Sequence, residues 1–349
     1  MSVFSCKVCG FRYDEWLGDS KNGVPPGIPF QRLAGSVCST CGLSGGRHER
    51  LPSPRYKGLE AAYYDQFAGK AGIRFYRDWI QAFDQPAAVL ELGTGTGRIA
   101  LELARHGISV CGVDNSPDMI EIAERKKRRL GKGKEPFLAI VEQEALDLQL
   151  DRAFTHVLLT EGFLQHFTLR SEQRRVLQLV REHMEEDGLA AIDLLLPPAG
   201  EKWQTERRKW VFPDKMVYQQ VQGETSYTRQ RFRYSLTYET FIDEVEQPRC
   251  RVDREMALML PGELVLLLES EHFDVVGMHE NYMADHPASY TQYGEEPPSG
   301  HSGQSQLAKG EYDLEKWTEG GYPFSGESGD SREEAARITL IVRKKSCNK

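Results

Sequence analysis

Apolar positions follow two helical stretches and then a series of short, nearly continuous runs. Between residues 58 and 83, apolar and aromatic residues recur at helical spacing, which predicts two helices with a break near Gly69 and Gly72. The run 87–92 is apolar at almost every position, which is typical of a buried strand. Further strands are expected at 109–114, 136–145, 154–160 and 189–196, with helices from residue 99, from near residue 117 and over 171–185. This alternation indicates βαβ units, so we expect a parallel sheet in an α/β fold.

The period changes to two between residues 203 and 258. Phe232, Tyr234, Leu236 and Tyr238 alternate with polar residues there, which predicts antiparallel strands in an insertion over 198–260. A helix over 263–273 and strands at 274–278 and 338–342 complete the expected sheet. Residues 285–331 are rich in Gly, Ser and Pro, which is typical of a long loop or insertion. We therefore expect one α/β domain over 51–349, with a helical cap at 58–84 and these two insertions.

Composition narrows the class of protein. The chain has 349 residues, of which 40% are hydrophobic, and this is enough for a large core. It carries 52 acidic and 44 basic residues, and the net charge of -8 argues against a protein that coats nucleic acid or anionic membrane. No apolar run is long enough for a membrane helix, and the N-terminus lacks the charged-then-apolar order of a signal peptide. We expect a soluble, cytoplasmic protein.

Two cysteine pairs near the N-terminus predict a metal site. Cys6 and Cys9 form one C-x2-C motif, and Cys38 and Cys41 form the second. In a reducing compartment such pairs favour metal ligation over disulfides, although two unrelated redox pairs are the alternative. Four thiolates in a tetrahedron suit zinc or iron, so we expect one such ion.

The residues between the pairs resemble the rubredoxin family. Tyr13-Asp14, Gly18-Asp19 and the loop 24–30 with sequence VPPGIPF lie where that family has them, and the resemblance covers about residues 4–43. One departure is Val37, where rubredoxins usually carry tryptophan. The resemblance implies a rubredoxin-like domain over 1–50 that binds iron, carries an electron and meets a redox partner. The alternative is a module that the metal only holds in shape, because a unit of this size has little core of its own.

The glycine-rich turn after the first strand of the larger domain predicts a nucleoside site. Gly93, Gly95 and Gly97 form G-x-G-x-G, with Glu91 two residues ahead of the first glycine. Asp114 ends the next strand, where its carboxylate can accept hydrogen bonds from ribose hydroxyls. A dinucleotide-binding turn would more usually show G-x-G-x-x-G.

The segments VLELGTGTGR and VDNSPDMIEIAE resemble class I methyltransferases that use S-adenosyl-L-methionine, over roughly residues 56–283 and the last strand. The resemblance implies a Rossmann-like fold and this methyl donor as cofactor. It places Gly93, Gly95 and Gly97 at the methionine and ribose, Asp114 at the ribose hydroxyls and Met119 on the adenine. The full set of implied cofactor residues is Tyr64, Tyr76, Glu91, Gly93, Thr94, Gly95, Gly97, Asp114, Asn115, Met119, Glu144, Ala145 and Thr160. For Tyr64 and Tyr76, packing in the core is an equally good interpretation.

Candidates for the transfer chemistry lie in the loop 160–166. His166 and Glu161 are candidate bases, because a nucleophile must shed a proton for transfer, although each residue has a purely structural alternative. Arg233 and Arg254 are candidates for binding an anionic substrate group, or are paired with acids. The basic run 125–129 favours a helix C-terminus over contact with RNA.

We therefore expect a methyltransferase for a small molecule, in a biosynthetic pathway, joined to a metal module. One alternative is an rRNA or tRNA methyltransferase with an N-terminal metal module, which the acid excess disfavours. The other is a metal- and nucleoside-binding protein without catalysis.

Overall fold

The computed structural model describes residues 3–9, 11–14, 19–25, 28, 30–33, 38, 40–42, 48–50, 56–83, 86–131, 133–282 and 337–345. The predicted insertion over 285–331, together with Gly10, Gly18 and Val37, lies outside the described residues.

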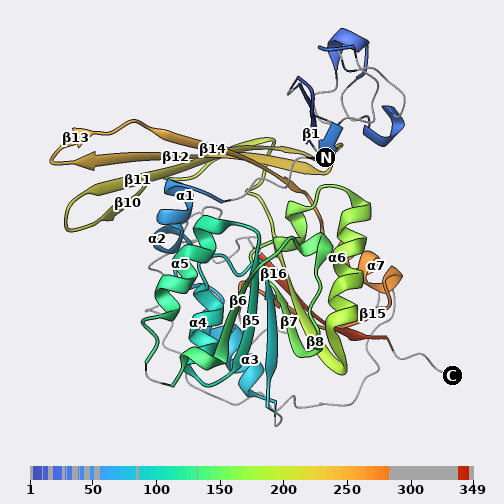
Figure 1. Ribbon diagram of the computed structural model, residues 1–349, viewed down its shortest axis with the longest axis vertical. Helices are drawn as coiled ribbons and strands as arrows, with labels where there is room; N and C mark the ends of the chain where they lie inside the picture. The colour runs from blue at the N-terminus through green and yellow to red at the C-terminus, as the bar shows by residue number, and fades with distance from the viewer. Residues whose placement is uncertain are drawn as a thin grey trace.

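A seven-stranded sheet forms the centre of the larger domain, in the order β15-β16-β8-β7-β4-β5-β6 (Figure 1). The five strands from β4 to β8 are parallel, and β16 is antiparallel to both of its neighbours, β8 and β15. The strands are β4 (Ala88–Leu92), β5 (Ser109–Asp114), β6 (Leu138–Glu142), β7 (Phe154–Leu159), β8 (Met184–Leu195), β15 (Phe273–Glu280) and β16 (Arg337–Lys344). The predicted parallel α/β core is confirmed.

Helices cover both faces of this sheet, which explains the continuous apolar runs of its central strands. Tyr76 and Leu103, from α3 and α4, pack on one face, whereas Val180 and Leu268, from α6 and α7, pack on the other. The helices of the core are α3 (Ile73–Gln81), α4 (Arg98–Arg105), α5 (Pro117–Lys127), α6 (Arg170–His183) and α7 (Pro261–Ser270). Short 3-10 helices connect them: η4 (Glu135–Phe137), η5 (Ala145–Asp147) and η6 (Phe163–His166).

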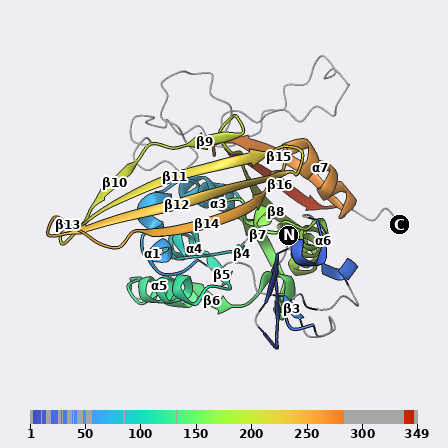
Figure 2. The same cartoon turned by 90° about the horizontal axis from the view of Figure 1, so that it is seen from above.

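The predicted insertion is an antiparallel sheet that crosses one end of the core (Figures 1 and 2). The inward residues of β12, Phe232 to Tyr238 at alternate positions, pack against Tyr63 and Phe67 of the cap helices. The strands are β9 (Lys202–Gln204), β10 (Arg208–Val211), β11 (Met216–Ser226), β12 (Arg231–Ile242), β13 (Val245–Glu246) and β14 (Cys250–Ala257). The cap itself consists of α1 (Leu59–Ala62), α2 (Tyr64–Ala68) and the core helix α3.

Some boundaries differ from the expected ones. The first cap helix is divided at Tyr63, and the helix expected to reach residue 185 ends at His183, because β8 already begins at Met184. The third strand ends at Glu142, so Glu144 and Ala145 lie beyond it rather than at its end. Helix and strand termini are set by backbone pairing, which apolar periodicity does not record.

The N-terminal module contains a small antiparallel sheet in the order β2-β1-β3. Its strands are β1 (Val3–Cys6), β2 (Arg12–Asp14) and β3 (His48–Arg50), and its 3-10 helices are η1 (Ser20–Asn22) and η2 (Phe30–Leu33). Phe4 stacks on Phe30 with ring centroids 4.3 Å apart. Tyr13 donates a hydrogen bond to the carbonyl of Ile28 at 2.7 Å. Within the described parts of the chain, no helix combines the length and apolar character needed to cross a membrane.

Candidate functional site

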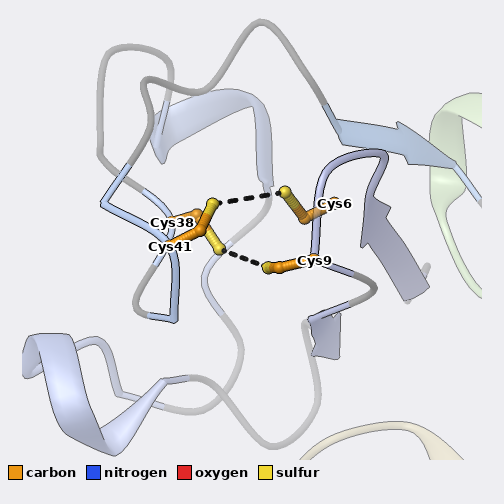
Figure 3. Close-up of side chains that lie close together, drawn as sticks. All are labelled: Cys6, Cys9, Cys38 and Cys41. Carbon is orange, nitrogen blue, oxygen red and sulfur yellow. Dashed lines mark hydrogen bonds between the residues drawn. The ribbon is translucent and has the colours of Figure 1, made fainter.

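The structure brings the four predicted metal ligands together (Figure 3). The Sγ atoms of Cys6 and Cys41 lie 3.8 Å apart, those of Cys9 and Cys38 lie 3.5 Å apart, and all four lie within 4.8 Å of one another. A tetrahedral ion with metal–sulfur bonds of about 2.3 Å has sulfur–sulfur edges of about 3.8 Å. The donor set and its spacing therefore fit one zinc or iron ion.

The three glycines in the predicted nucleotide turn share a left-handed backbone conformation but differ in how closely other atoms surround them. Gly93, Gly95 and Gly97 have φ angles of 73°, 56° and 75°, in the left-handed region that side chains disfavour. A Cβ on Gly93 would lie 2.3 Å from the Phe163 ring, whereas a Cβ on Gly97 would press on Leu101 at 3.2 Å. At Gly95 the nearest atoms to such a Cβ would be 3.9 Å away. Gly95 is therefore the least crowded of the three glycines, because a Cβ there would make only ordinary van der Waals contacts.

Asp114 is fixed by backbone groups on both sides of its carboxylate. Its Oδ2 accepts a hydrogen bond from the Gly95 N–H at 2.8 Å, and its Oδ1 accepts one from the Ser116 N–H at 2.8 Å. Burial raises the pKa of Asp114 above its usual value. Each oxygen keeps a second lone pair, so the pre-oriented carboxylate can accept hydrogen bonds from two ribose hydroxyls.

Other predicted cofactor residues surround the same turn. Met119 is buried, and its sulfur lies 3.9 Å from the position that a Cβ on Gly95 would take. Asn115 donates from Nδ2 to Glu144 Oε2 at 2.9 Å, across the ends of β5 and β6. Ala145 is half-buried after β6, and Thr160 is buried directly after β7. These positions lie at the carboxyl ends of neighbouring parallel strands, where the fold binds its ligands.

Glu91 stabilises the glycine-rich turn through a buried hydrogen bond. It is buried, and Thr94 donates from its hydroxyl to Glu91 Oε2 at 2.7 Å. Burial raises the pKa of Glu91 to about 7. Its contacts are therefore those of an internal brace for Gly93 to Gly97 rather than those of a group facing the ligand space.

The cap helices are fastened to this turn. Thr96 donates to Asp65 Oδ1 at 2.5 Å, and Lys126 forms an ion pair with Asp65. One member of the basic run 125–129 thus has an internal role. The segment before the cap is attached to the start of α5 as well, because the Tyr56 carbonyl accepts a hydrogen bond from the Ser116 hydroxyl at 2.5 Å.

Tyr76 does not close over the cofactor, so this prediction is wrong. The side chain is fully buried on the α3 face of the sheet, and its hydroxyl donates to Asp193 Oδ1 at 2.5 Å. Burial raises the pKa of Tyr76 well above its usual value. Core packing, the alternative interpretation of the same pattern, is what the structure has.

A pocket opens between the cap and the antiparallel sheet, at the carboxyl edge of β7 and β8. Three of the residues predicted for the site line it, namely Tyr64, Glu161 and His166. The complete lining is Tyr56, Glu60, Tyr64, Phe67, Ala68, Glu161, His166, Leu195, Arg208, Gln219, Tyr234, Leu236, Tyr238 and Met256. Most of these residues were missed by the sequence analysis. The inward period-two positions of β12 were the available signal for Tyr234, Leu236 and Tyr238.

His166 is the pocket residue whose side chain is best placed to accept a hydrogen bond from a bound molecule. Its ring lies 5.9 Å from that of Tyr56 in an edge-to-face arrangement, and no hydrogen bond joins its ring nitrogens to the described residues. Burial, with a smaller contribution from Arg254, lowers the pKa of His166 to about 4. The imidazole is therefore neutral at pH 7, and its nitrogens can bond to a molecule in the pocket.

The contacts of Glu161 do not suit a base. Its carboxylate binds Arg98 at 2.5 Å and Arg337 at 2.9 Å. Its backbone N–H donates to Asp193 Oδ2 at 2.8 Å, which fixes a φ angle of 57°. Each carboxylate oxygen is thus engaged by a guanidinium group, so we replace the proposed base role by one in shaping the pocket wall.

Neither arginine proposed for an anionic substrate is available for one. Arg254 forms a bidentate ion pair with Glu60, in which Nε lies 3.0 Å from Oε1. Arg254 is 6% exposed and Glu60 is 1% exposed. Arg233 donates from Nε to Glu255 Oε2 at 2.6 Å. The alternative that these strand arginines are paired with acids is what the structure has.

Two family models match the chain. Residues 89–188 match a family described as a methyltransferase domain, and residues 3–47 match the rubredoxin family. Among curated relatives, the demethylmenaquinone methyltransferase of Thermotoga maritima is 36% identical over 116 residues, which is 32% of this chain and 45% of the relative. The chain spans about half the length of the curated relatives it matches.

Solved structures share the fold. The CcbJ methyltransferase from Streptomyces caelestis superposes with a TM-score of 0.58 at 18% identity, over 85% of this chain and 100% of that one. The sugar N-methyltransferase KedS8 from Streptoalloteichus sp. ATCC 53650 superposes with a TM-score of 0.54 at 16% identity, over 67% and 92% of the two chains. At such identities the likeness establishes the fold alone.

Proposed function

Since residues 89–188 carry a class I methyltransferase domain and residues 3–47 a rubredoxin domain, we propose that the chain methylates a small molecule with S-adenosyl-L-methionine. The observation that carries this proposal is the pairing of Asp114 with Gly95. The carboxylate of Asp114, which would bind the ribose, accepts a hydrogen bond from the backbone of Gly95, the least crowded of the three glycines in the turn. The pocket between the cap and the antiparallel sheet would hold the acceptor.

The residues present fit the methyl donor. Gly95 and Asp114 would hold the ribose, Met119 would pack on the adenine, and Thr160 would border the methyl-transfer point. The bound donor supplies a methyl group that is already activated by its sulfonium. The protein then has to place the acceptor in line with this methyl group and exclude water from it.

The acceptor would enter between the cap and the antiparallel sheet. Four tyrosines and Phe67 line this pocket, together with Leu195, Leu236 and Met256. An apolar pocket with a few polar groups is typical of a small-molecule site. The neutral His166 imidazole would accept a hydrogen bond from the nucleophile and orient its lone pair toward the donor. The sugar N-methyltransferase that shares the fold supports an acceptor of this size.

A labelling experiment tests the proposal. The protein is incubated with S-adenosyl-L-methionine carrying a labelled methyl group, in separate small-molecule and RNA fractions of a cell extract. We expect label in the small-molecule fraction, and about 3- to 10-fold less of it with His166→Gln at unchanged donor affinity, because the variant loses the hydrogen bond that orients the nucleophile. Label in RNA alone would overturn the assignment of a small-molecule acceptor, and full activity of the variant would remove His166 as the hydrogen-bond partner of the nucleophile.

For the N-terminal module we propose one bound ion whose first role is to hold the module in shape. Iron and zinc both fit the four sulfurs, and they are distinguished by colour. An iron-loaded module absorbs visible light and bleaches on reduction with dithionite, which would support electron transfer. A colourless protein with one zinc ion per chain would support a structural role only.

A further inference from the structure

The loop after β7 (160–166) contacts the glycine-rich turn and the acceptor pocket at the same time. The ring of Phe163 in this loop lies so close to Gly93 that a Cβ on the glycine would be 2.3 Å from it. Glu161 and His166 of the same loop line the pocket between the cap and the antiparallel sheet, which we call the acceptor pocket. The position of this loop therefore determines where an acceptor would lie relative to the turn.

The backbone of this loop has an unfavourable conformation at Glu161. The φ angle of Glu161 is 57°, in the left-handed region that residues with a side chain rarely adopt. Its N–H donates to Asp193 Oδ2 at 2.8 Å. Asp193 is fully buried and accepts further hydrogen bonds from the hydroxyls of Tyr76, Tyr282 and Thr339. Such a conformation persists only where surrounding contacts fix it, so the contacts of Glu161 determine the course of the loop.

Arg98 joins three parts of the site through one guanidinium group. It follows Gly97 directly and begins α4, so its backbone continues the glycine-rich turn. Its Nη2 donates to Glu161 Oε1 at 2.5 Å. Its Nη1 donates to two carbonyls of the cap, that of Ala71 at 2.6 Å and that of Gly69 at 3.3 Å. The turn, the cap and the loop after β7 therefore meet at this side chain, which is only 9% exposed.

The contacts of Arg98 indicate an indirect role in the site. Arg98 is not among the described residues that line the acceptor pocket, and both of its Nη atoms are engaged by the cap and by Glu161. Arg337 donates to the second oxygen of Glu161, Oε2, at 2.9 Å. Arg98 therefore influences a molecule in the acceptor pocket through Glu161 and the cap.

We propose that Arg98 is a positioning residue for methyl transfer, which fixes the loop 160–166 relative to the glycine-rich turn. The inference rests on the proposed methyltransferase function and adds a residue to that same site. Transfer requires the nucleophile to lie in line with the donor methyl group, and a displacement of about 1 Å costs about 10²-fold in rate. The loop carries Thr160, beside the proposed transfer point, and His166, which would orient the nucleophile. A guanidinium group that holds this loop in place therefore controls the rate of transfer from outside the acceptor pocket.

The variant Arg98→Lys tests this role in the full chain. Lysine keeps the charge but has a single terminal nitrogen, which cannot replace both Nη atoms. The labelling assay on the small-molecule fraction, run at increasing concentrations of S-adenosyl-L-methionine, gives the apparent maximal rate and the KM for the donor. We expect the maximal rate to fall about 10- to 10²-fold. The donor KM and the calorimetric affinity for S-adenosylhomocysteine should be unchanged, because Asp114 still binds the Gly95 N–H.

Arg105→Lys is the matched control for this variant. Arg105 lies at the other end of α4, its side chain is 59% exposed, and it pairs with Glu102 at 3.2 Å. The same substitution there should change neither the rate of transfer nor the affinity for S-adenosylhomocysteine.

A double variant shows whether Arg98 acts through Glu161. Glu161→Gln breaks the same contact from the carboxylate side, so it should also slow the transfer at unchanged affinity for S-adenosylhomocysteine. Because the two residues act as a pair, the double variant should be no slower than the slower single variant. If Arg98→Lys fails to fold, Glu161→Gln decides by itself, and a wild-type rate in it would overturn the proposal.

Hydrogen exchange distinguishes positioning from a general loss of stability. In protein saturated with S-adenosylhomocysteine, Arg98→Lys should exchange faster than the wild type over 69–72 and 160–166, while α6 keeps its protection. Equally faster exchange in α6 would show a purely structural role and would overturn the proposal.

The remaining outcomes separate this inference from the function on which it rests. A wild-type rate in Arg98→Lys, a donor affinity that falls as much as the rate, or single effects that multiply in the double variant would overturn the positioning role. Each of these results would leave the methyltransferase proposal intact. Failure of the wild-type protein to bind S-adenosylhomocysteine or to transfer label would overturn both.

Discussion

The metal module and the acceptor pocket are held together in opposite ways. In the module, four sulfurs from two short motifs meet within 4.8 Å, around a small core that includes Phe4, Tyr13 and Phe30. The acceptor pocket takes its wall from the cap, from the loop after β7 and from the antiparallel sheet, all of which rest on a large buried core. A bound ion should therefore determine the fold of the first region, whereas buried side chains determine that of the second.

Removal of the metal should have the largest effect and should be confined to the module. Structural ions in sites of this kind contribute about 10–16 kcal/mol of apparent binding free energy, so the metal-free module should unfold. Hydrogen exchange should become fast over residues 3–50, while residues 86–131 and 133–282 keep their protection. Loss of protection in the core as well would show that the two regions fold as one unit, and the comparison would fail.

The same contrast decides what the sequence could predict. The Cys6–Cys9 and Cys38–Cys41 pairs and the turn from Gly93 to Gly97 are local patterns, and the structure brings each of them together as expected. Glu60 and Arg254 are far apart in the sequence although they are in contact in the structure, and no local sequence pattern relates them. Tyr64 and Tyr76 show the limit clearly. Both fit a helical aromatic pattern, but one lines the pocket and the other is buried against Asp193.

Glu60→Gln should destabilise the core. The change leaves Arg254 buried without an anionic partner, and breaking a buried pair in this way costs about 3–5 kcal/mol. Urea denaturation measures the loss. Asp253→Asn is the matched control, because Asp253 and Arg251 form a pair on the same strand, with side chains 71% and 58% exposed. The control should change stability by about 1 kcal/mol or less, and equal losses in the two variants would show that burial of the Glu60 pair has no energetic role.

Asp114→Asn should weaken the binding of S-adenosyl-L-methionine by about 1–3 kcal/mol. One oxygen of the carboxylate is replaced by an NH₂ group, which cannot accept a hydrogen bond from Gly95 or Ser116. The side chain is then less well oriented and has fewer acceptor sites for the ribose hydroxyls. Calorimetric titration measures the affinity, with Asp253→Asn again as the control. Unchanged affinity in Asp114→Asn would remove this residue from the site.

The buried His166 should make the stability of the chain depend on pH. Its pKa is lowered to about 4 in the folded chain, against 6.5 for the free side chain. Between these two pKa values the imidazole is protonated in the unfolded chain but not in the folded chain. The free energy of unfolding should therefore decrease as the pH falls from 6.5 toward 4. His166→Gln should flatten this slope in urea denaturation at pH 7, 5.5 and 4.5. An identical slope in the variant would mean that the imidazole is not shielded from water.

The central claim is that Gly95 and Asp114 bind the methyl donor. Calorimetric titration of the full chain with S-adenosyl-L-methionine tests it most directly, with S-adenosylhomocysteine as competitor. The account predicts saturable binding of one donor per chain, displaced by the demethylated product and retained after the metal is removed. Absence of heat at all concentrations, together with absence of competition, would contradict it.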